Sequence, residues 1–445
     1  MSTDPFANFP VNLGITPDAY KPNIPHKKNE GQHPSRIKQA LFWFFALVCL
    51  AGFTLTLSEV ILRNMNGPWS NTFFHQYDPV LGTWHIASHT GDYVREDFEI
   101  RGIEINAFGM RDRERTLKKA PGTVRIAVLG DSFTEAFHVK NEETFTRVLE
   151  KNLGEGVEVL NFGVAGFGTI QELLTYREKV RQLHPDIVIL AFLSANDMRN
   201  NSRVLEDLYT GTTNTDRPFP ERIATSGDWT IVLPEPKPSA TNPVILFLKK
   251  HFTTYRFLWY AKSALIARYA LAPQGSVTEE PAATTTAEKN KIRSVPAYLA
   301  RLFTPTKDEP FASAWDATEW AIGELRKEVE SDGGKFVLIT LPDNVKMERD
   351  PKAVLEKEYG EKLPVGFDID YPEKRLAAFS VKEGIRYYDL TSGFRAKRDE
   401  LRLESPYFSY EHDGHWNPKG HELAAHLIGE YLFRSGLVPV AKSKR

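Results

Sequence analysis

A serine, a histidine and an aspartate occupy positions from which they could carry out nucleophilic catalysis. Ser132 follows a short apolar run, 124–129, within the sequence GDSFT. His415 and Asp413 lie in the sequence DGHWN, directly before a helical stretch near the end of the chain. Histidine can take the proton of a serine hydroxyl, and a carboxylate fixes the imidazole tautomer and stabilises the imidazolium. The three residues therefore indicate attack on a carbonyl, although a turn with a capping serine would explain GDS alone.

Two further segments contain candidate donors for an oxyanion. The apolar run 157–162 ends in NFGVAGFG (161–168), and the run 186–192 leads into SAND (194–197). A backbone N–H or a side-chain amide aimed at a developing oxyanion contributes roughly 10²–10³ in rate. Parallel strands bring their carboxyl ends to one edge of a sheet, where α/β proteins bind ligands. The two segments could therefore serve Ser132, although glycines before a helix can also form a simple tight turn.

In chain order, the four segments resemble the sequence blocks of the SGNH (GDSL-like) hydrolase family: GDSFTE (130–135), NFGVAGFG (161–168), SAND (194–197) and DGHWN (413–417). The resemblance covers 124–201 and 311–434, and it implies a three-layer α/β/α sandwich that acts on ester bonds. It implies Ser132 as the nucleophile and His415 as its base. It also implies an oxyanion hole made by the backbone N–H groups of Ser132 and Gly166 and the side-chain amide of Asn196. Gly163 matches the family glycine less well.

The acidic residue departs from the family pattern. Most members carry an aspartate three residues before the histidine, but position 412 is a histidine here. We expect Asp413 to orient His415, with Glu411 as the alternative acid, while a loop or capping role would explain Asp413 without catalysis. A D-x-H pair of this kind is similar to the one in alginate O-acetylation proteins of the same superfamily. There the pair precedes the serine, so the likeness is partial.

The elements that must position these residues alternate between strands and helices. Such alternation predicts an α/β fold with a five-stranded parallel sheet covered by helices on both faces, formed by 124–201 and 311–437. The expected strands are the buried apolar runs 124–129, 157–162, 186–192, 335–341 and 385–390. The expected helices are 142–153, 169–183, 312–331, 373–381 and 418–434. Asp131, directly after the first strand, is expected to brace the turn at Ser132.

Residues 202–310 form a large insertion in this alternating pattern. Asn242-Pro243 predicts the start of a helix that runs to about 271, rich in aromatic and basic residues. That helix could lie on a membrane surface, cover the active site or pack against the core. The stretch 275–291 is poor in apolar residues and predicts a mobile loop.

An N-terminal extension, 63–123, precedes the first expected strand of the sheet. Its glycines, aspartates and aromatic residues predict short strands and loops. The spacing of His75, His85 and His89 matches no known metal site, so these are expected to be surface or packing residues, and no metal or cofactor is predicted. The stretch INAFGMRD (105–112) resembles one that often precedes such domains in bacterial envelope proteins.

An uncharged apolar stretch lies close to the N-terminus. The residues Ala40–Ser58 and the apolar positions that follow are long enough to cross a bilayer as a helix. Several lysines and arginines precede the stretch, whereas only Arg63 follows it closely. The positive-inside rule then predicts a disordered cytoplasmic tail (1–38), a transmembrane signal anchor (39–62) and a periplasmic or extracellular remainder. A cleaved signal peptide is the alternative, but the long preceding stretch and the lack of a small-x-small site argue against it.

Composition narrows the remaining classes of function. The 445-residue chain has a formal net charge of −2, which gives no sign of a nucleic-acid partner. Its single cysteine, Cys49, excludes intramolecular disulfides and multi-cysteine zinc sites. The expected function is a membrane-anchored esterase that cleaves O-acyl, foremost O-acetyl, esters on envelope or extracellular glycans. An O-acyltransferase that moves the acyl group to a sugar hydroxyl is one alternative, and a non-catalytic scaffold on a hydrolase fold is another.

Overall fold

The computed structural model describes residues 35–65, 71–210, 216–235, 242–270, 295–360, 362–403 and 406–438. The expected mobile loop 275–291 and nearly all of the expected tail 1–38 lie outside the described residues. The chain divides into two compact units, Met1–Thr56 and Leu57–Arg445. Most of helix α1 (Arg36–Arg63) belongs to the first unit.

A five-stranded parallel sheet forms the centre of the second unit. Its strands are β5 (Val124–Gly130), β6 (Val157–Gly163), β7 (Ile187–Phe192), β10 (Lys335–Thr340) and β11 (Arg386–Asp389). They follow the order β11-β10-β7-β5-β6, and every neighbouring pair is parallel. Each lies within about a residue of an expected apolar run, so the prediction of an α/β fold with this sheet is confirmed.

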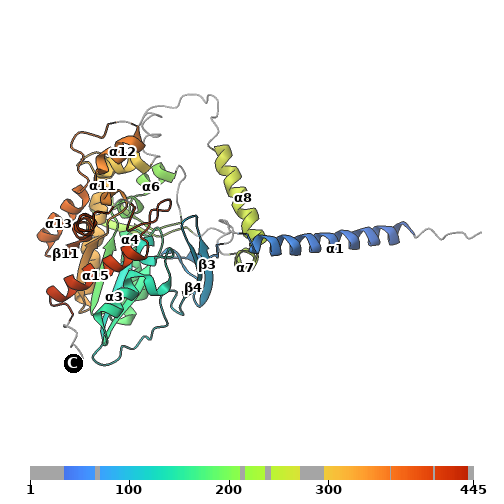
Figure 1. Ribbon diagram of the computed structural model, residues 1–445, viewed down its shortest axis with the longest axis horizontal. Coiled ribbons are helices and arrows are strands. Elements are labelled where there is room, and N and C mark those ends of the chain that lie inside the picture. Colours follow the sequence, from blue (N-terminus) through green and yellow to red (C-terminus); the bar gives the residue numbers. More distant parts are fainter. Residues whose placement is uncertain are drawn as a thin grey trace, which may run out of the picture. The chain divides into compact units, whose positions relative to one another are not determined.

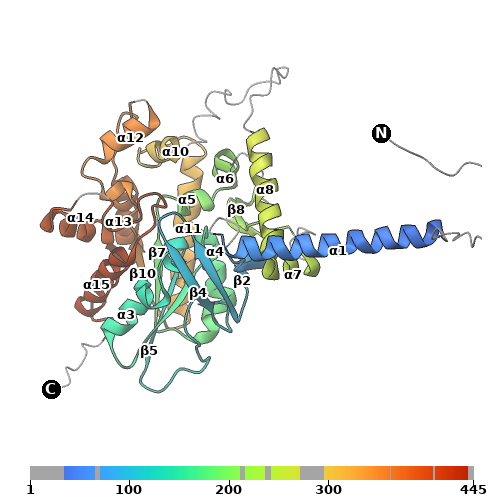
Figure 2. The same cartoon turned by 45° about the vertical axis from the view of Figure 1, so that its right-hand side comes forward.

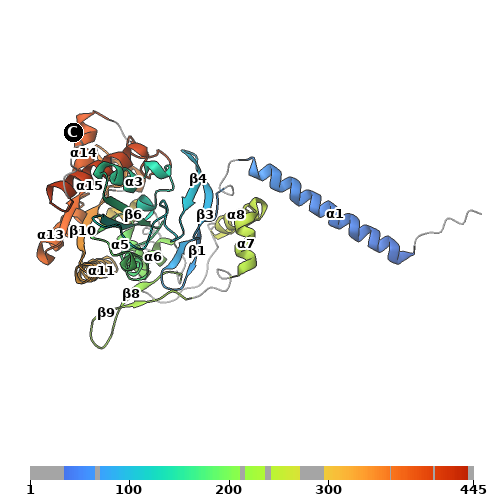
Figure 3. The ribbon, with the colours of Figure 1, turned by 90° about the horizontal axis from the view of Figure 1, so that it is seen from below.

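Helices cover both faces of the sheet, which makes three layers (Figures 1 and 3). Alternate residues of β5 point to opposite faces, as strand geometry requires. Ile126 and Val128 pack on the side of α3 (Phe145–Leu153), α14 (Leu390–Glu400) and α15 (Pro418–Arg434). Ala127 and Leu129 pack on the side of α4 (Thr169–Thr175), α11 (Phe311–Ser331) and α13 (Tyr371–Glu383). Both faces are therefore buried, which explains why the strands are apolar along their whole length.

Two expected helices are interrupted. The stretch 169–183 is α-helical only to Thr175 and continues as the π-helical turn η3 (Tyr176–Val180) and the 3₁₀ turn η4 (Arg181–Leu183). The expected helix from Pro243 divides at Phe252, whose backbone is extended, into α7 (Pro243–His251) and α8 (Thr253–Ala270). The carboxylate of Glu59 accepts the N–H groups of Thr253 and Thr254 at 2.9 and 2.8 Å and so caps α8.

The extension and the insertion add short elements around the sheet (Figure 2). The extension forms the antiparallel hairpins β1 (His75–Asp78) with β2 (Gly82–His85) and β3 (His89–Val94) with β4 (Glu99–Ile105). The insertion contains α6 (Arg203–Thr210), the hairpin β8 (Phe219–Arg222) with β9 (Trp229–Val232), α7, α8 and α10 (Val295–Leu302). A further helix, α12 (Pro351–Tyr359), lies between β10 and α13.

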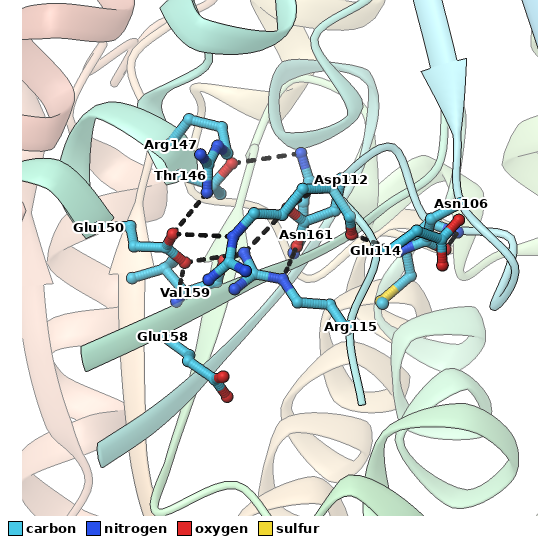
Figure 4. Close-up of polar contacts among 12 residues, drawn as sticks. Asn106, Asp112, Glu114, Arg115, Thr146, Arg147, Glu150, Glu158, Val159 and Asn161 are labelled. Atoms are coloured by element: carbon cyan, nitrogen blue, oxygen red, sulfur yellow. Dashed lines mark hydrogen bonds and ion pairs between the residues drawn. The ribbon is translucent and has the colours of Figure 1, made fainter. Parts of the chain in front are cut away.

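The end of the extension closes the free edge of the sheet at β6 (Figure 4). Arg115 donates to the carbonyl of Val159 at 2.7 Å, and Glu150 of α3 accepts the N–H of Val159 at 2.8 Å. Arg115 is itself paired with Asp112 at 2.8 Å, and both side chains are buried. Backbone groups that an edge strand would leave unpaired are thus satisfied by side chains. The structure therefore gives Asp112 a role that the sequence did not reveal.

Candidate active site

Ser132 begins the short helix α2 (Ser132–Glu135), immediately after β5. Asp131 caps this helix, since its carboxylate accepts the N–H of Phe133 at 2.9 Å. The turn is too tight for side chains at two glycines. A Cβ on Gly130 would lie 2.2 Å from Thr134 Oγ1, and one on Gly163 would lie 2.2 Å from the backbone nitrogen of Glu135. The sharp turn holds the Ser132 hydroxyl at the carboxyl end of the sheet, where the other strand ends also lead.

Ser132, His415 and Asp413 form a continuous series of hydrogen bonds. Ser132 Oγ lies 2.8 Å from His415 Nε2, and His415 Nδ1 lies 2.6 Å from Asp413 Oδ1. A carboxylate can only accept, so Nδ1 of His415 carries the hydrogen and Nε2 presents its lone pair to the hydroxyl. Burial works to raise the pKa of Asp413, but the hydrogen bonds and charge of His415 and the charge of Arg95 together lower that pKa. In this arrangement a serine can act as nucleophile, a histidine as general base and a carboxylate as the anion that orients it.

Asp97, in the turn between β3 and β4, fixes the loop that carries His415. Its Oδ2 accepts the backbone N–H groups of His412 and Asp413 at 2.7 and 2.9 Å. The ring of His412 also bonds Asp97, with Nδ1 2.6 Å from Oδ1. The histidine that stands at the usual family position of the aspartate is therefore directed toward Asp97. Glu411, the alternative acid, is exposed, and His415 Nδ1 is already occupied by Asp413.

A second imidazole, that of His138, stacks on His415. The ring centroids are 3.8 Å apart and the planes differ by 12°. His138 Nε2 lies 3.5 Å from Asp413 Oδ1, and the rings of Tyr93 and Phe98 pack edge-on against His138. Burial, together with the nearby charge of His415, lowers the pKa of His138 well below its usual range, so His138 is neutral at physiological pH. No motif in the sequence singles out this residue.

The expected oxyanion donors differ in how the structure places them. Gly163 donates its N–H to Asn161 Oδ1 at 2.9 Å and so has no free donor. Within the described part of the chain, the backbone N–H groups of Ser132 and Gly166 have no acceptor. Asn196 donates one amide hydrogen to Asp131 Oδ2 at 2.9 Å, which leaves the second hydrogen for another acceptor. Asp131 thus orients Asn196 in addition to bracing the turn.

Ser132, Asn196, Asp413 and His415 line one open pocket of about 620 Å³. Loops at the ends of β5, β7 and β10 contribute to its wall, and the insertion adds Tyr298 and Leu299 of α10. The charged side chains that line the pocket are mostly acidic, and Arg199 is the one arginine among them. The acidic residues are Asp343, Glu348, Glu358, Glu411 and Asp413. Gly166 lines a neighbouring cavity of about 280 Å³ instead. A larger pocket of about 750 Å³, between α3, α14 and α15, contains none of these residues.

Comparisons with known proteins were made by sequence and by structure. No family model and no curated protein matches the chain. Among solved structures, the chain is similar to an acetyl xylan esterase, with 12% identity, 70% of this chain and 100% of that chain covered, and a TM-score of 0.35. A GDSL-like lipase from Bacteroides thetaiotaomicron VPI-5482 shares 12% identity, with 70% and 88% covered and a TM-score of 0.31. Both names, esterase and lipase, denote enzymes that act on ester bonds.

A third similar structure is a catalytic mutant of Axe2, an acetylxylan esterase from Geobacillus stearothermophilus. It shares 12% identity, with 70% of this chain and 94% of that chain covered and a TM-score of 0.32. Identities and overlaps this low carry no information about individual residues. The chemistry of the site therefore follows from the geometry of this chain alone.

Proposed function

We propose that this protein is a serine hydrolase that cleaves ester bonds through an acyl-enzyme on Ser132. The observation that carries the proposal is the hydrogen-bonded series from Ser132 Oγ through His415 to Asp413, at 2.8 and 2.6 Å, which opens on a pocket of about 620 Å³. Pockets of about 300–1,000 Å³ suit small organic ligands. A scaffold would not require these groups in hydrogen-bonding sequence.

The proposed reaction has two halves. Ser132 Oγ attacks the ester carbonyl while His415 Nε2 takes the hydroxyl proton, and the carbonyl oxygen becomes an oxyanion. Backbone N–H groups of Ser132 and Gly166 and the amide of Asn196 stabilise that charge. The tetrahedral intermediate collapses, and His415 returns the proton to the departing alcohol. Water then attacks the acyl-enzyme in the same way, releasing the acid and restoring Ser132.

We propose O-acyl groups, foremost O-acetyl groups, on envelope or extracellular glycans as the substrate. Helix α1 supports this location, because it is 28 residues long and apolar enough to cross a membrane. An 18-residue stretch of the helix has a mean hydropathy of 2.2, and none of that stretch is buried. The basic residues before it favour a cytoplasmic N-terminus and a periplasmic or extracellular hydrolase unit. Such a tether would keep the pocket close to envelope polymers.

Hydrolysis of p-nitrophenyl acetate by the full-length protein in detergent tests the proposal. Wild type and the control Ser392→Ala, an exposed position outside the pocket, should release p-nitrophenol, whereas Ser132→Ala should not. A fluorophosphonate probe should label wild type at Ser132. Equal rates for wild type and Ser132→Ala would remove Ser132 from the mechanism, and the lack of labelling would favour a non-catalytic scaffold.

A second candidate function is transfer of the acyl group to a sugar hydroxyl. The D-x-H pair of Asp413 and His415 favours it, because a similar pair occurs in alginate O-acetylation proteins, and a membrane tether suits an envelope acyltransferase. Transferase and hydrolase share the acyl-enzyme and differ in the acceptor. Incubation with an acyl donor and a glycan should then give acylated glycan, whereas free acid as the sole product would exclude transfer to that glycan.

A further inference from the structure

A second group of imidazoles and a carboxylate is built around Glu135, at the opposite end of helix α2 from Ser132. His75 of β1 and His85 of β2 both direct Nε2 at the same oxygen, Oε1 of Glu135, at distances of 2.9 and 2.8 Å. Glu135 is the last residue of α2, three positions after Ser132. The three ligand-type atoms all lie within 4.8 Å of one another. No local sequence pattern predicts this meeting, because Glu135 lies 50 residues after His85 in the chain.

The two contacts of the His85 ring require a positive charge on the ring or between it and Glu135. His85 Nδ1 lies 2.9 Å from the carbonyl oxygen of Gly109, which can only accept, so the hydrogen of a neutral ring is on Nδ1. Nε2 then directs a lone pair at a carboxylate oxygen, and two acceptors do not approach to 2.8 Å without a positive charge between them. A second ring proton would make His85 an imidazolium with a fully buried side chain, and a buried charge is costly. A metal ion supplies the same charge.

The surroundings hold the three groups in the orientation that ligation needs. The bond from His85 Nδ1 to the Gly109 carbonyl is the outer contact that fixes the ring of a metal-bound histidine. Arg111 donates to the backbone carbonyl of Glu135 at 2.9 Å, and Ala165 donates its N–H to Glu135 Oε1 at 3.1 Å. Gly109 itself is in the left-handed region, with φ 73°, and a Cβ there would lie 2.3 Å from Trp84 Nε1. The carbonyl that orients His85 is therefore rigidly placed.

The spacing and access also suit an ion. Two ligands about 2.0–2.1 Å from zinc are roughly 2.9 Å apart at a right angle and roughly 3.3 Å apart in a tetrahedron. The observed 2.8 and 2.9 Å match the first geometry and are a small ring rotation from the second. His75 has a side chain that is 30% exposed and lines the cavity of about 280 Å³, so an ion and a water ligand can enter from that side.

We propose that His75, His85 and Glu135 bind a divalent transition-metal ion, with zinc as the best match. Two imidazoles and one carboxylate that leave a position open to solvent are a ligand set that zinc accepts. The ion would fix Glu135, which holds Ala165 and thereby the loop of Gly166 beside the Ser132 turn. Metal binding at this place does not depend on the proposed esterase function.

Zinc titration of the full-length protein tests the proposal. Protein in detergent is stripped with EDTA, dialysed and titrated with ZnCl₂ by calorimetry, and bound zinc per chain is measured by mass spectrometry. Wild type should bind about one zinc ion per chain. His75→Ala and Glu135→Gln should weaken binding by at least roughly 100-fold, because even outer-shell changes cost 10–100-fold. His75 is partly exposed, so its variant should fold, which circular dichroism checks.

Two further variants separate this site from other histidines. His426→Ala, exposed on α15, should bind zinc as wild type does. His415→Ala should also retain binding, although it removes the only other described group of this kind, His138, Asp413 and His415. Absence of zinc binding in wild type would overturn the proposal. The three side chains would then be held together only by hydrogen bonds. Loss of binding in His415→Ala with retention in His75→Ala would overturn it as well.

Discussion

Two groups of the same composition, two imidazoles and one carboxylate, involve the two ends of helix α2: one contacts Ser132 and the other contains Glu135. They consist of His138, His415 and Asp413 in one case and His75, His85 and Glu135 in the other. In the first group the carboxylate meets Nδ1 of a histidine, so Nε2 is free to face a hydroxyl. In the second, both Nε2 atoms face the carboxylate and converge on one point. The nitrogen that meets the carboxylate therefore decides whether such a group suits proton transfer or ligation.

The two groups also differ in how far their histidines are exposed to solvent. His415 has a side chain that is 25% exposed and lines the pocket, which the proposed role as a base toward substrate requires. His85 is fully buried and bonded to a backbone carbonyl, which suits a fixed ligand. The rings of His138 and His415 stack 3.8 Å apart, and burial together with the charge of His415 lowers the pKa of His138. On the roles proposed for the two groups, burial and the partner of one ring nitrogen would give identical residue types different chemistry.

The largest difference should appear in ester hydrolysis when His415 is removed. His415→Ala should lower kcat on p-nitrophenyl acetate by about 10⁴–10⁶-fold, because the serine loses its base. The double variant Ser132→Ala with His415→Ala should be no slower than either single variant, since the two act as one unit. A decrease in kcat of less than tenfold in His415→Ala would show that His415 does not act as the base for Ser132.

Loss of the amide of Asn196 should have the next largest effect. Asn196→Ala should lower kcat by about 10²–10³-fold with little change in KM, because the amide is needed for the oxyanion and not for the ester ground state. Asn344→Ala, in the same pocket, is the matched control and should change kcat little. Equal losses in the two variants would point to pocket shape in place of oxyanion binding.

Zinc should stabilise the folded protein only through the group of His75, His85 and Glu135. At a zinc concentration of 100 times Kd, binding to the folded state adds about 2.7 kcal/mol to the free energy of unfolding. Urea unfolding with and without ZnCl₂ measures this gain. Asp413→Asn should retain it and Glu135→Gln should lose it. The reverse result would exchange the roles of the two groups.

The smallest effect concerns the pH dependence of stability at His138. The pKa of His138 in the fold is well below its ordinary value of 6.5, so the folded state binds this proton more weakly than the unfolded state. The stability from neutral His138 is complete above pH 6.5 and is lost as pH falls below it, by up to about 1.4 kcal/mol per pH unit. His138→Phe, which retains a ring, should reduce this slope in urea unfolding between pH 6.5 and 5. An unchanged slope would show that His138 is not held neutral.

The sheet was predictable because its strands are buried on both faces. Runs such as 124–129 and 157–162 are apolar at nearly every position, and each has a strand within about a residue of the expected bounds. Helix α14 was missed because its sequence, LTSGFRAKRDE, is mostly polar and buries only three side chains. The division of α7 from α8 was also missed, since the capping carboxylate of Glu59 lies 194 residues before Thr253.

The candidate site was predictable where its residues occur in short blocks. Ser132, Asn196, Asp413 and His415 each stand in a recognisable segment, and all four line one pocket. Their catalytic roles stay predictions until activity is measured. Asp97 and His138 gave no such signal, because Asp97 bonds a loop 315 residues further along and His138 meets the rings and carboxylate of the site only in the folded chain. Contacts of this kind depend on the folded arrangement and leave no local pattern.

The hydrogen bonds between Asp97 and the backbone of residues 412 and 413 constrain how the chain can evolve. A gene that kept every strand of the sheet but exchanged the hairpin at 89–105 would encode a protein with a loosened loop around His415. The hairpin at 89–105 and the segment at 411–417 should therefore evolve as a pair. Recombination between related genes should succeed when both come from one parent and fail when they come from two.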